Sequence, residues 1–205
     1  MSTVELEPMP VEADVEPLHP DRLSIEQYDR IADAGILGPR DRVFLREGIL
    51  IKKMTKFPAH FYATAAIDRA VGSLLPAGWT NFQEGPVNLA GSSVPEPDLL
   101  VVRGRLEHFR RRRPGVAEVS LVVEVAESSL AFDQGPVLRA HADNLIPVCG
   151  IVNIPDARIE VYREPTGPAE RPHYRKVDHH AAGQEMPLIL GGREVGRIAV
   201  DEILP

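Results

Sequence analysis

Two carboxylates stand in segments whose neighbours are apolar. Asp98 begins the run Leu99–Val102, and Glu124 lies inside Leu121–Ala126. An ionised carboxylate buried there is costly unless an ion pair, a hydrogen-bond network or a metal compensates it. If the two segments are neighbouring strands, both carboxylates can converge on one hard cation such as Mg²⁺, which favours carboxylate oxygens together with water and phosphate. The alternative is that each buried acid pairs with a distant arginine.

Signatures of other common enzyme classes are absent from the sequence. It contains no G-x-S-x-G nucleophile elbow, no P-loop, no G-x-G-x-x-G turn and no C-x-x-C pair. The single cysteine, Cys149, stands at the start of an apolar run, which indicates a buried structural thiol. The seven histidines are scattered, which disfavours a histidine metal site. Asp98 and Glu124 are therefore the strongest candidate site.

Helical and strand patterns alternate around these two carboxylates. Apolar residues three and four apart predict a helix from Pro58 to Leu75, and a capping box at Ser24 begins a short helix over 25–34. Nearly continuous apolar runs at 99–102 and 119–125 predict central strands covered on both faces. Weaker patterns predict strands at 43–45, 49–51, 151–154 and 159–162, strands near 174 and 195–200, a helix at 136–144 and an irregular stretch over 167–183. The expected fold is an α/β sandwich with a mixed sheet.

Composition and charge bound the kind of protein. The 205 residues are 43% hydrophobic and 26% charged, which fits one globular domain with a hydrophobic core. The net charge of −7 argues weakly against a general polyanion binder, but much of it lies in the acidic, proline-rich residues 1–20, which we expect to be a mobile tail. Residues 21–205 then form the single domain. No run is apolar enough to span a membrane, and the lone cysteine fits a reducing cytoplasm.

Arginines crowd one short stretch after the Asp98 segment. Four of them are consecutive, Arg110, Arg111, Arg112 and Arg113, and a Pro-Gly pair closes the run. A charge run of this kind is usually a solvated surface. The other interpretation is a phosphate-contacting surface that binds nucleic acid without reading its sequence.

The ordered set of motifs resembles the PD-(D/E)xK nuclease superfamily and, more closely, the Uma2 family of restriction endonucleases. Pro97-Asp98 and Glu124-Val125-Ala126 are similar to the acidic elements of the superfamily. The resemblance to Uma2 covers about residues 24–205, and its other motifs are Val43–Gly48, Pro58-Ala59-His60, Gln83-Glu84, Ser128-Ser129-Leu130, Asp133 and Ile146-Pro147. It implies a restriction-endonuclease-like core, with a mixed β-sheet flanked by helices, and Mg²⁺- or Mn²⁺-dependent cleavage of DNA.

The resemblance also implies roles for single residues. Asp98 and Glu124 would hold the metal and act in catalysis, with Glu47 and Gln83 as further catalytic candidates. The expected partner is DNA, without a membrane contact, and a homodimer is left open.

The sequence departs from the family pattern at the lysine that orients or deprotonates the attacking water. The superfamily position for this lysine is Ala126, and the Uma2 position on the following helix is Val137. Arg139 lies about 200° from Val137 around a helix, and arginine cannot give up its proton. We therefore expect impaired cleavage, which Val137→Lys would raise. The alternative is a non-catalytic nuclease-fold module for nucleic-acid binding or assembly.

Overall fold

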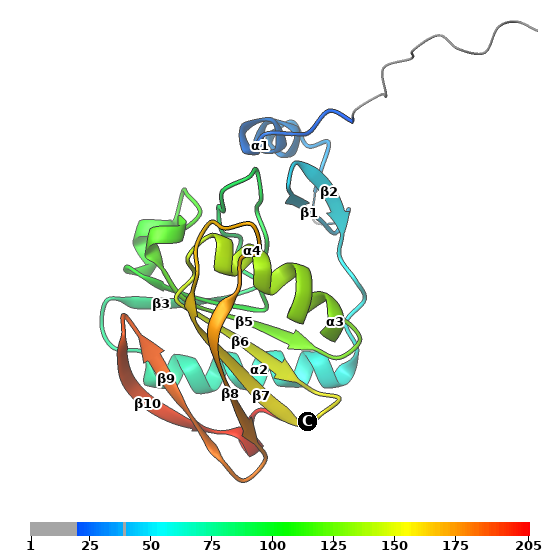
Figure 1. Ribbon diagram of the computed structural model, residues 1–205. Coiled ribbons are helices and arrows are strands. Elements are labelled where there is room, and N and C mark those ends of the chain that lie inside the picture. The colour runs from blue at the N-terminus through cyan, green and yellow to red at the C-terminus, as the bar shows by residue number, and fades with distance from the viewer. Residues whose placement is uncertain (1–19, 39) are drawn as a thin grey trace, which may run out of the picture.

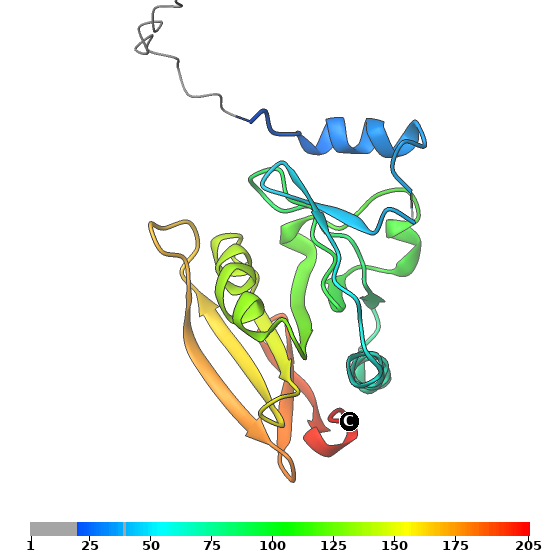
Figure 2. The same cartoon turned by 90° about the vertical axis from the view of Figure 1, so that its right-hand side faces the viewer.

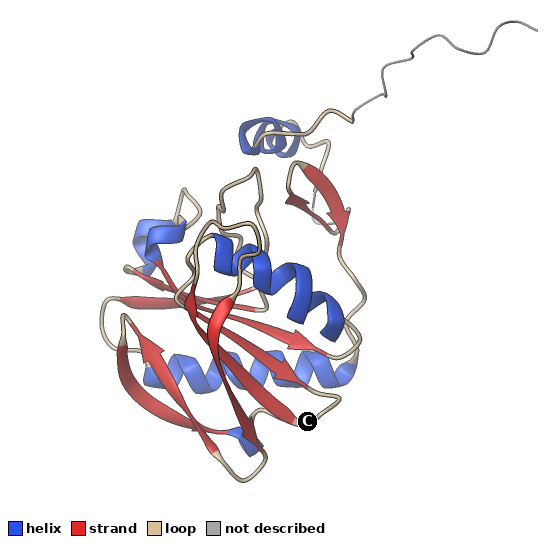
Figure 3. Ribbon diagram, in the orientation of Figure 1, coloured by secondary structure: helices blue, strands red, loops and turns tan. Residues whose placement is uncertain are grey.

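The computed structural model describes residues 20–38 and 40–205 and shows a mixed α/β architecture (Figures 1 and 3). Apart from residue 20, the predicted tail lies outside the described residues. A six-stranded sheet with the order β3-β4-β5-β6-β7-β8 forms the centre, and β1-β2 and β9-β10 form separate two-stranded sheets. Within the described residues, no helix is long and apolar enough to cross a membrane.

Helices and strands alternate along the chain, as the sequence patterns predict. The helices are α1 (Ile25–Asp33), α2 (Pro58–Leu74), α3 (Leu130–Phe132) and α4 (Leu138–Asp143). The strands are β1 (Val43–Arg46), β2 (Ile49–Lys52), β3 (Trp79–Gln83), β4 (Leu99–Arg103), β5 (Val119–Ala126), β6 (Val148–Asn153), β7 (Arg158–Pro165), β8 (Tyr174–Ala181), β9 (Glu185–Leu190) and β10 (Arg193–Ala199). Short 3-10 turns cover Leu106–Phe109, Val116–Glu118 and Val200–Glu202, and a π-helical turn covers Asp133–Val137.

Strand β5 is central to the sheet because it pairs with β4 and β6 in different directions. It runs antiparallel to β4, with Leu99 opposite Val123, and parallel to β6. A parallel pair needs a long crossover connection, and the segment containing α3 and α4 supplies it. The prediction that the segments of Asp98 and Glu124 form neighbouring strands is therefore confirmed.

The side chains of β4 and β5 alternate between two hydrophobic cores. Leu99 and Val123 pack in the core beneath α2, which contributes Ile67, whereas Leu100 packs in a second core with Leu138 of α4. Figure 1 shows α4 in front of the sheet and α2 behind it. The strands are thus covered on both faces, which explains why their sequences are almost continuously apolar.

The β1-β2 hairpin turns at Glu47-Gly48, as its sequence predicts. Both turn residues have positive φ angles, 48° for Glu47 and 75° for Gly48. A Cβ at Gly48 would lie 2.6 Å from the Cβ of Arg22, so only glycine fits without a shift in the backbone. Figure 2 shows α1 lying across this hairpin, away from the central sheet and the helices that cover it.

The structure differs from the predicted elements in three places, and the first two differences have a physical cause. The predicted helix at 136–144 begins earlier, at Leu130, and passes through a π-helical turn at Pro136, because proline cannot donate the regular backbone hydrogen bond. The strand predicted near 174 is confirmed as β8, but the rest of the stretch 167–183 is less irregular than predicted, since this partly exposed and polar edge strand continues to Ala181. Strands β3 and β9 were not predicted.

A buried carboxylate fixes the sheet to the crossover segment. Glu160 of β7 is fully buried and accepts hydrogen bonds from Gln134, Asn153, Arg158 and Tyr162 at 2.6–3.1 Å. Burial works to raise the pKa of Glu160, but these hydrogen bonds outweigh burial and lower its pKa to about 2.

Glu160→Gln should lower the free energy of unfolding by about 1.5–3 kcal/mol, because hydrogen bonds to a charged acceptor are lost. Since the folded-state pKa lies below the ordinary value of 4.5, this stabilisation is present above pH 4.5 and is lost as the pH falls towards 2. Urea unfolding at several pH values measures both effects. The control Glu164→Gln removes an exposed partner of Lys176 and should change stability by less than about 1 kcal/mol. Equal effects of the two substitutions would contradict the prediction.

Candidate functional site

The antiparallel register of β4 and β5 brings the two predicted carboxylates together. Leu99 pairs with Val123 in this register. Asp98 precedes Leu99 and Glu124 follows Val123, so Asp98 and Glu124 face each other across the two strands. A carboxylate oxygen of Asp98 accepts a hydrogen bond from the backbone N–H of Val125 at 2.8 Å. Asp98 is 7% exposed, so the pair lies within the fold at one end of the sheet.

Lys56, which precedes α2, and His60, which lies within it, both reach Asp98. The ammonium of Lys56 donates to Asp98 Oδ1 at 2.6 Å and to Glu84 Oε1 at 3.0 Å, and His60 Nε2 lies 3.2 Å from Asp98 Oδ2. Burial works to raise the pKa of Asp98, but the His60 hydrogen bond and the charge of Lys56 outweigh it and hold this pKa below its usual value. The pKa of Lys56 is raised, because Asp98 and Glu84 outweigh the effect of burial.

The environment of Glu124 has the opposite effect on its acidity. Burial and the neighbouring charge of Asp98 raise the pKa of Glu124 to about 8. Burial and the charge of Glu124 likewise raise the pKa of Asp133 to about 7. His141 Nε2 lies 3.2 Å from Glu124 Oε1, and burial lowers the pKa of His141 to about 4, so its imidazole is neutral. The site therefore concentrates carboxylates that resist full ionisation.

These groups line one cavity of about 740 Å³ between the hairpin, the sheet and the crossover segment. Of the sequence-predicted residues, Asp98, Glu124, Glu47 and Val137 line it. Glu47 lies at the hairpin turn with its side chain 66% exposed, and its carboxylate lies 3.9 Å from Arg46 Nε. The cavity wall also carries Arg46, Lys52, Lys53, Phe44, Phe57 and Phe132.

Two other candidates lie outside the lining of this cavity. Gln83 ends β3 with its side chain exposed, and the next residue, Glu84, is the one that contacts Lys56. Arg139 is exposed and also lies outside the cavity lining. Within the described residues, neither Asp98 nor Glu124 pairs with a distant arginine. Asp98 pairs with Lys56 and His60, and Glu124 contacts His141.

The donor atoms in the cavity suit a hard divalent cation held in part by substrate. Among the described residues, His, Cys, Asp and Glu form no group of three or more placed to hold a metal, which disfavours an all-protein metal cage. Mg²⁺ is usually bound through one or two carboxylates, with water and phosphate completing the shell. Two facing carboxylates, one of which has its pKa raised by the charge of the other, fit this mode of binding.

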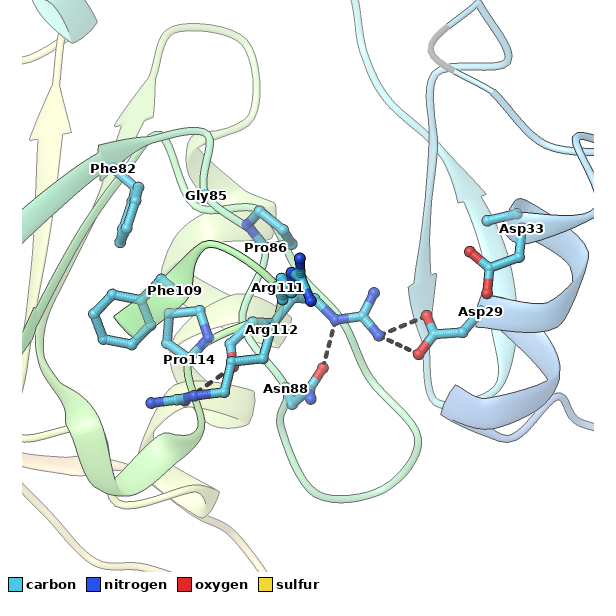
Figure 4. Close-up of a pocket in the computed structure, with 12 residues that line it drawn as sticks. Asp29, Asp33, Phe82, Gly85, Pro86, Asn88, Phe109, Arg111, Arg112 and Pro114 are labelled. Carbon is cyan, nitrogen blue, oxygen red and sulfur yellow. Dashed lines mark hydrogen bonds and ion pairs between the residues drawn. The ribbon is translucent and has the colours of Figure 1, made fainter. Parts of the chain in front are cut away.

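The arginine run borders a different cavity, of about 750 Å³ (Figure 4). The run follows the end of β4 opposite to Asp98, and five strand residues span about 17 Å. Arg112 donates two hydrogen bonds to Glu118 at 2.6–2.7 Å, and Arg113 donates two to Asp29 at 2.5–2.6 Å. Arg110 and Arg111 form no ion pair within the described residues, so they are the members of the run that remain available to a phosphate.

Sequence reasoning missed Lys56 and His141 as members of the site. Lys56 precedes α2 in a loop and belongs to no motif, so the sequence carries no signal that it would reach Asp98. His141 lies on α4, the helix of the crossover that packs against β5, and its position one turn after Val137 is a signal that could have found it. His60 belongs to the Pro58-Ala59-His60 motif, but the sequence alone does not indicate its contact with Asp98.

Comparisons with known proteins find matches described as nucleases. The family model described as "Uma2: Putative restriction endonuclease" matches residues 25–200. Among solved structures, a "putative nuclease belonging to DUF820" from Anabaena variabilis matches with a TM-score of 0.58 at 11% identity, over 88% of this chain and 97% of that chain. No curated protein matches. At this identity the structural match supports a shared fold, the mixed sheet flanked by helices that the sequence predicts.

Glu124→Gln should stabilise the metal-free protein by about 2 kcal/mol at pH 8 and above, because the amide replaces a charge that burial and Asp98 disfavour. The folded-state pKa of about 8 exceeds the ordinary value of 4.5, so Glu124 lowers stability progressively as the pH rises from 4.5 through 8. The two proteins should therefore be equally stable near pH 4.5. Urea unfolding with a chelator measures this, with exposed Glu107→Gln as the control. A less stable variant at pH 8 would contradict the assigned environment.

Proposed function

Because the chain belongs to the Uma2 family, we propose that it is an Mg²⁺-dependent endonuclease that hydrolyses the phosphodiester bonds of DNA. The observation that carries this proposal is the meeting of Asp98, Glu124 and Lys56 in one cavity. The second candidate is a nuclease-fold module that binds nucleic acid without cleaving it, and the absence of a lysine at both family positions favours it.

Asp98 and Glu124 would hold Mg²⁺ or Mn²⁺ in this proposal. The bound cation supplies charge stabilisation at the phosphate and makes water more acidic. Hydrolysis adds the hydroxyl of water to phosphorus and breaks the bond to the leaving oxygen, which takes up the proton. His60 and the backbone N–H of Val125 orient the Asp98 carboxylate through its second oxygen.

Lys56 would supply the positive charge that family members place at a strand or helix lysine. Its contact with Asp98 at 2.6 Å puts the ammonium beside the carboxylate pair. Its raised pKa keeps the side chain protonated at neutral pH, so Lys56 acts as a hydrogen-bond donor and a charge rather than as a general base. Cleavage by the unmodified protein is therefore compatible with the valine at position 137.

Lys56→Met should reduce DNA cleavage by about 10²- to 10³-fold, because a preorganised charge at the phosphate is lost. Mg²⁺ binding, measured by calorimetry, should persist or tighten because the ammonium no longer competes for Asp98. In the Lys56→Met background, Val137→Lys should restore part of the activity, since residue 137 lines the same cavity. Asp98→Asn serves as the control that should lose both metal binding and cleavage.

A cleavage assay on plasmid DNA, single-stranded DNA and RNA separates the two candidate functions. Metal binding without cleavage of any substrate by the wild type would favour the non-catalytic module. Full activity in Lys56→Met would remove Lys56 from the mechanism.

The arginine run would bind the DNA backbone away from the reactive pair. Replacing Arg110 and Arg111 together with alanine should weaken binding to all sequences and reduce the slope of log affinity against log salt by up to about 2. Replacing Arg112 should matter less for DNA, because Glu118 already holds its guanidinium. Fluorescence anisotropy over a salt series measures this, and unchanged binding in the double variant would return the run to a solvated surface.

A further inference from the structure

The phenylalanines of the chain are unevenly distributed around the reactive cavity. The sequence has six, and three of them, Phe44, Phe57 and Phe132, line this cavity. Phe57 is 52% exposed and Phe132 is 43% exposed. By contrast, the phenylalanines that border the second cavity pack against each other edge to face, with ring centroids 5.7 Å apart. Exposed rings at the cavity carry apolar surface that a ligand could remove from water.

Each exposed ring is adjacent in sequence to a polar member of the site. Phe57 follows Lys56 directly and precedes the first residue of α2, and Phe132 ends α3 directly before Asp133. Figure 1 shows the beginning of α2 and α3 at the same end of the sheet. The Arg46 guanidinium lies over the Phe132 ring, 4.9 Å from its centroid, so a cation covers one face of this ring. The rings are therefore positioned by the same short segments that position the reactive groups.

Four Lys and Arg side chains line the cavity with these rings, beside eight carboxylates, and three of the four cations lie in one segment. Lys52, Lys53 and Lys56 lie in the segment that leads to Phe57, and all three line the cavity. Lys53 pairs with Glu96, whereas Lys52 forms no ion pair within the described residues. A positively charged surface with aromatic side chains is typical for binding single strands, in which bases stack on rings while cations follow the backbone. The lysine-rich segment 52–57 is the part of the cavity wall that fits this description.

A duplex cannot use such rings, because its base faces are covered by their stacked neighbours unless a base is extruded. The reactive carboxylates lie inside a cavity, with Asp98 almost fully buried, rather than on a convex surface that would follow a groove.

We propose that this site takes single-stranded nucleic acid, with an unpaired base stacked on Phe57 or Phe132 and the adjacent phosphate at the Asp98–Glu124 pair. This inference rests on the proposed function and narrows its substrate from DNA in general to an unpaired strand.

The test measures binding separately from cleavage, by anisotropy of labelled single-stranded DNA, single-stranded RNA and duplex DNA. All variants keep Asp98, and Ca²⁺ replaces Mg²⁺ so that the carboxylate pair can hold a cation while little substrate is consumed. Phe57→Ala and Phe132→Ala should each weaken single-strand binding by about 5- to 100-fold, which corresponds to the loss of one stacked base, and should leave duplex binding nearly unchanged. Phe57→Trp should retain the affinity.

The matched control is Phe61→Ala, which removes a ring that is 69% exposed on α2 but does not line the cavity. It should leave binding unchanged, and thermal unfolding confirms that every variant folds. Equal affinity for single strand and duplex, with no effect of Phe57→Ala, would overturn the inference. Wild-type protein that cleaves duplex as well as single strands would overturn it too and leave the proposed function standing. Absence of cleavage with every substrate, alongside ring-dependent single-strand binding, would instead overturn the proposed function alone.

Discussion

Two like-charged carboxylates held side by side at the end of an apolar sheet are the constraint on which the site depends. Asp98 and Glu124 face each other where β4 begins and β5 approaches its end. In a low-dielectric environment their repulsion is large, and it is relieved by a cation or by a proton. The structure uses both, since Lys56 and His60 contact Asp98 while the pKa of Glu124 rises to about 8. This arrangement lowers stability in exchange for a site that binds positive charge.

The groups that contact the pair come from both faces of the sheet. Lys56 precedes α2 and His60 lies in its first turn, on one face, and His141 comes from α4 on the other face. The pair lies where the two helical layers meet the end of the central strands. The hydrophobic cores on both faces therefore also fix the distances within the site, because a shift of either helix would separate a charge from its partner.

The features that could be predicted from sequence are those encoded in local patterns. The helix from Pro58, the hairpin at Glu47-Gly48 and the two central strands follow from periodicity and turn residues, and the proximity of Asp98 to Glu124 follows from pairing those strands. Strand β8 was predicted only near its first residue, because a partly exposed edge strand lacks a continuous apolar run. Lys56 was missed for another reason, because its contact with Asp98 joins residues far apart in the chain through the path of a loop.

The position of Lys56 shows how a positive charge can reach the carboxylate pair although both motif positions lack a lysine. Ala126 is fully buried against α4, so a lysine there would have to displace packed apolar side chains. Val137 borders the cavity from the crossover segment, and Lys56 borders it from the segment before α2. What the carboxylate pair requires is a positive charge within hydrogen-bonding distance, and a flexible side chain of this length can supply it from several backbone positions. A sequence motif records one of these positions, whereas the electrostatic effect on the pair depends on the distance between the ammonium and the carboxylates. A valine at the family position therefore does not remove the positive charge from the site, because Lys56 lies 2.6 Å from Asp98.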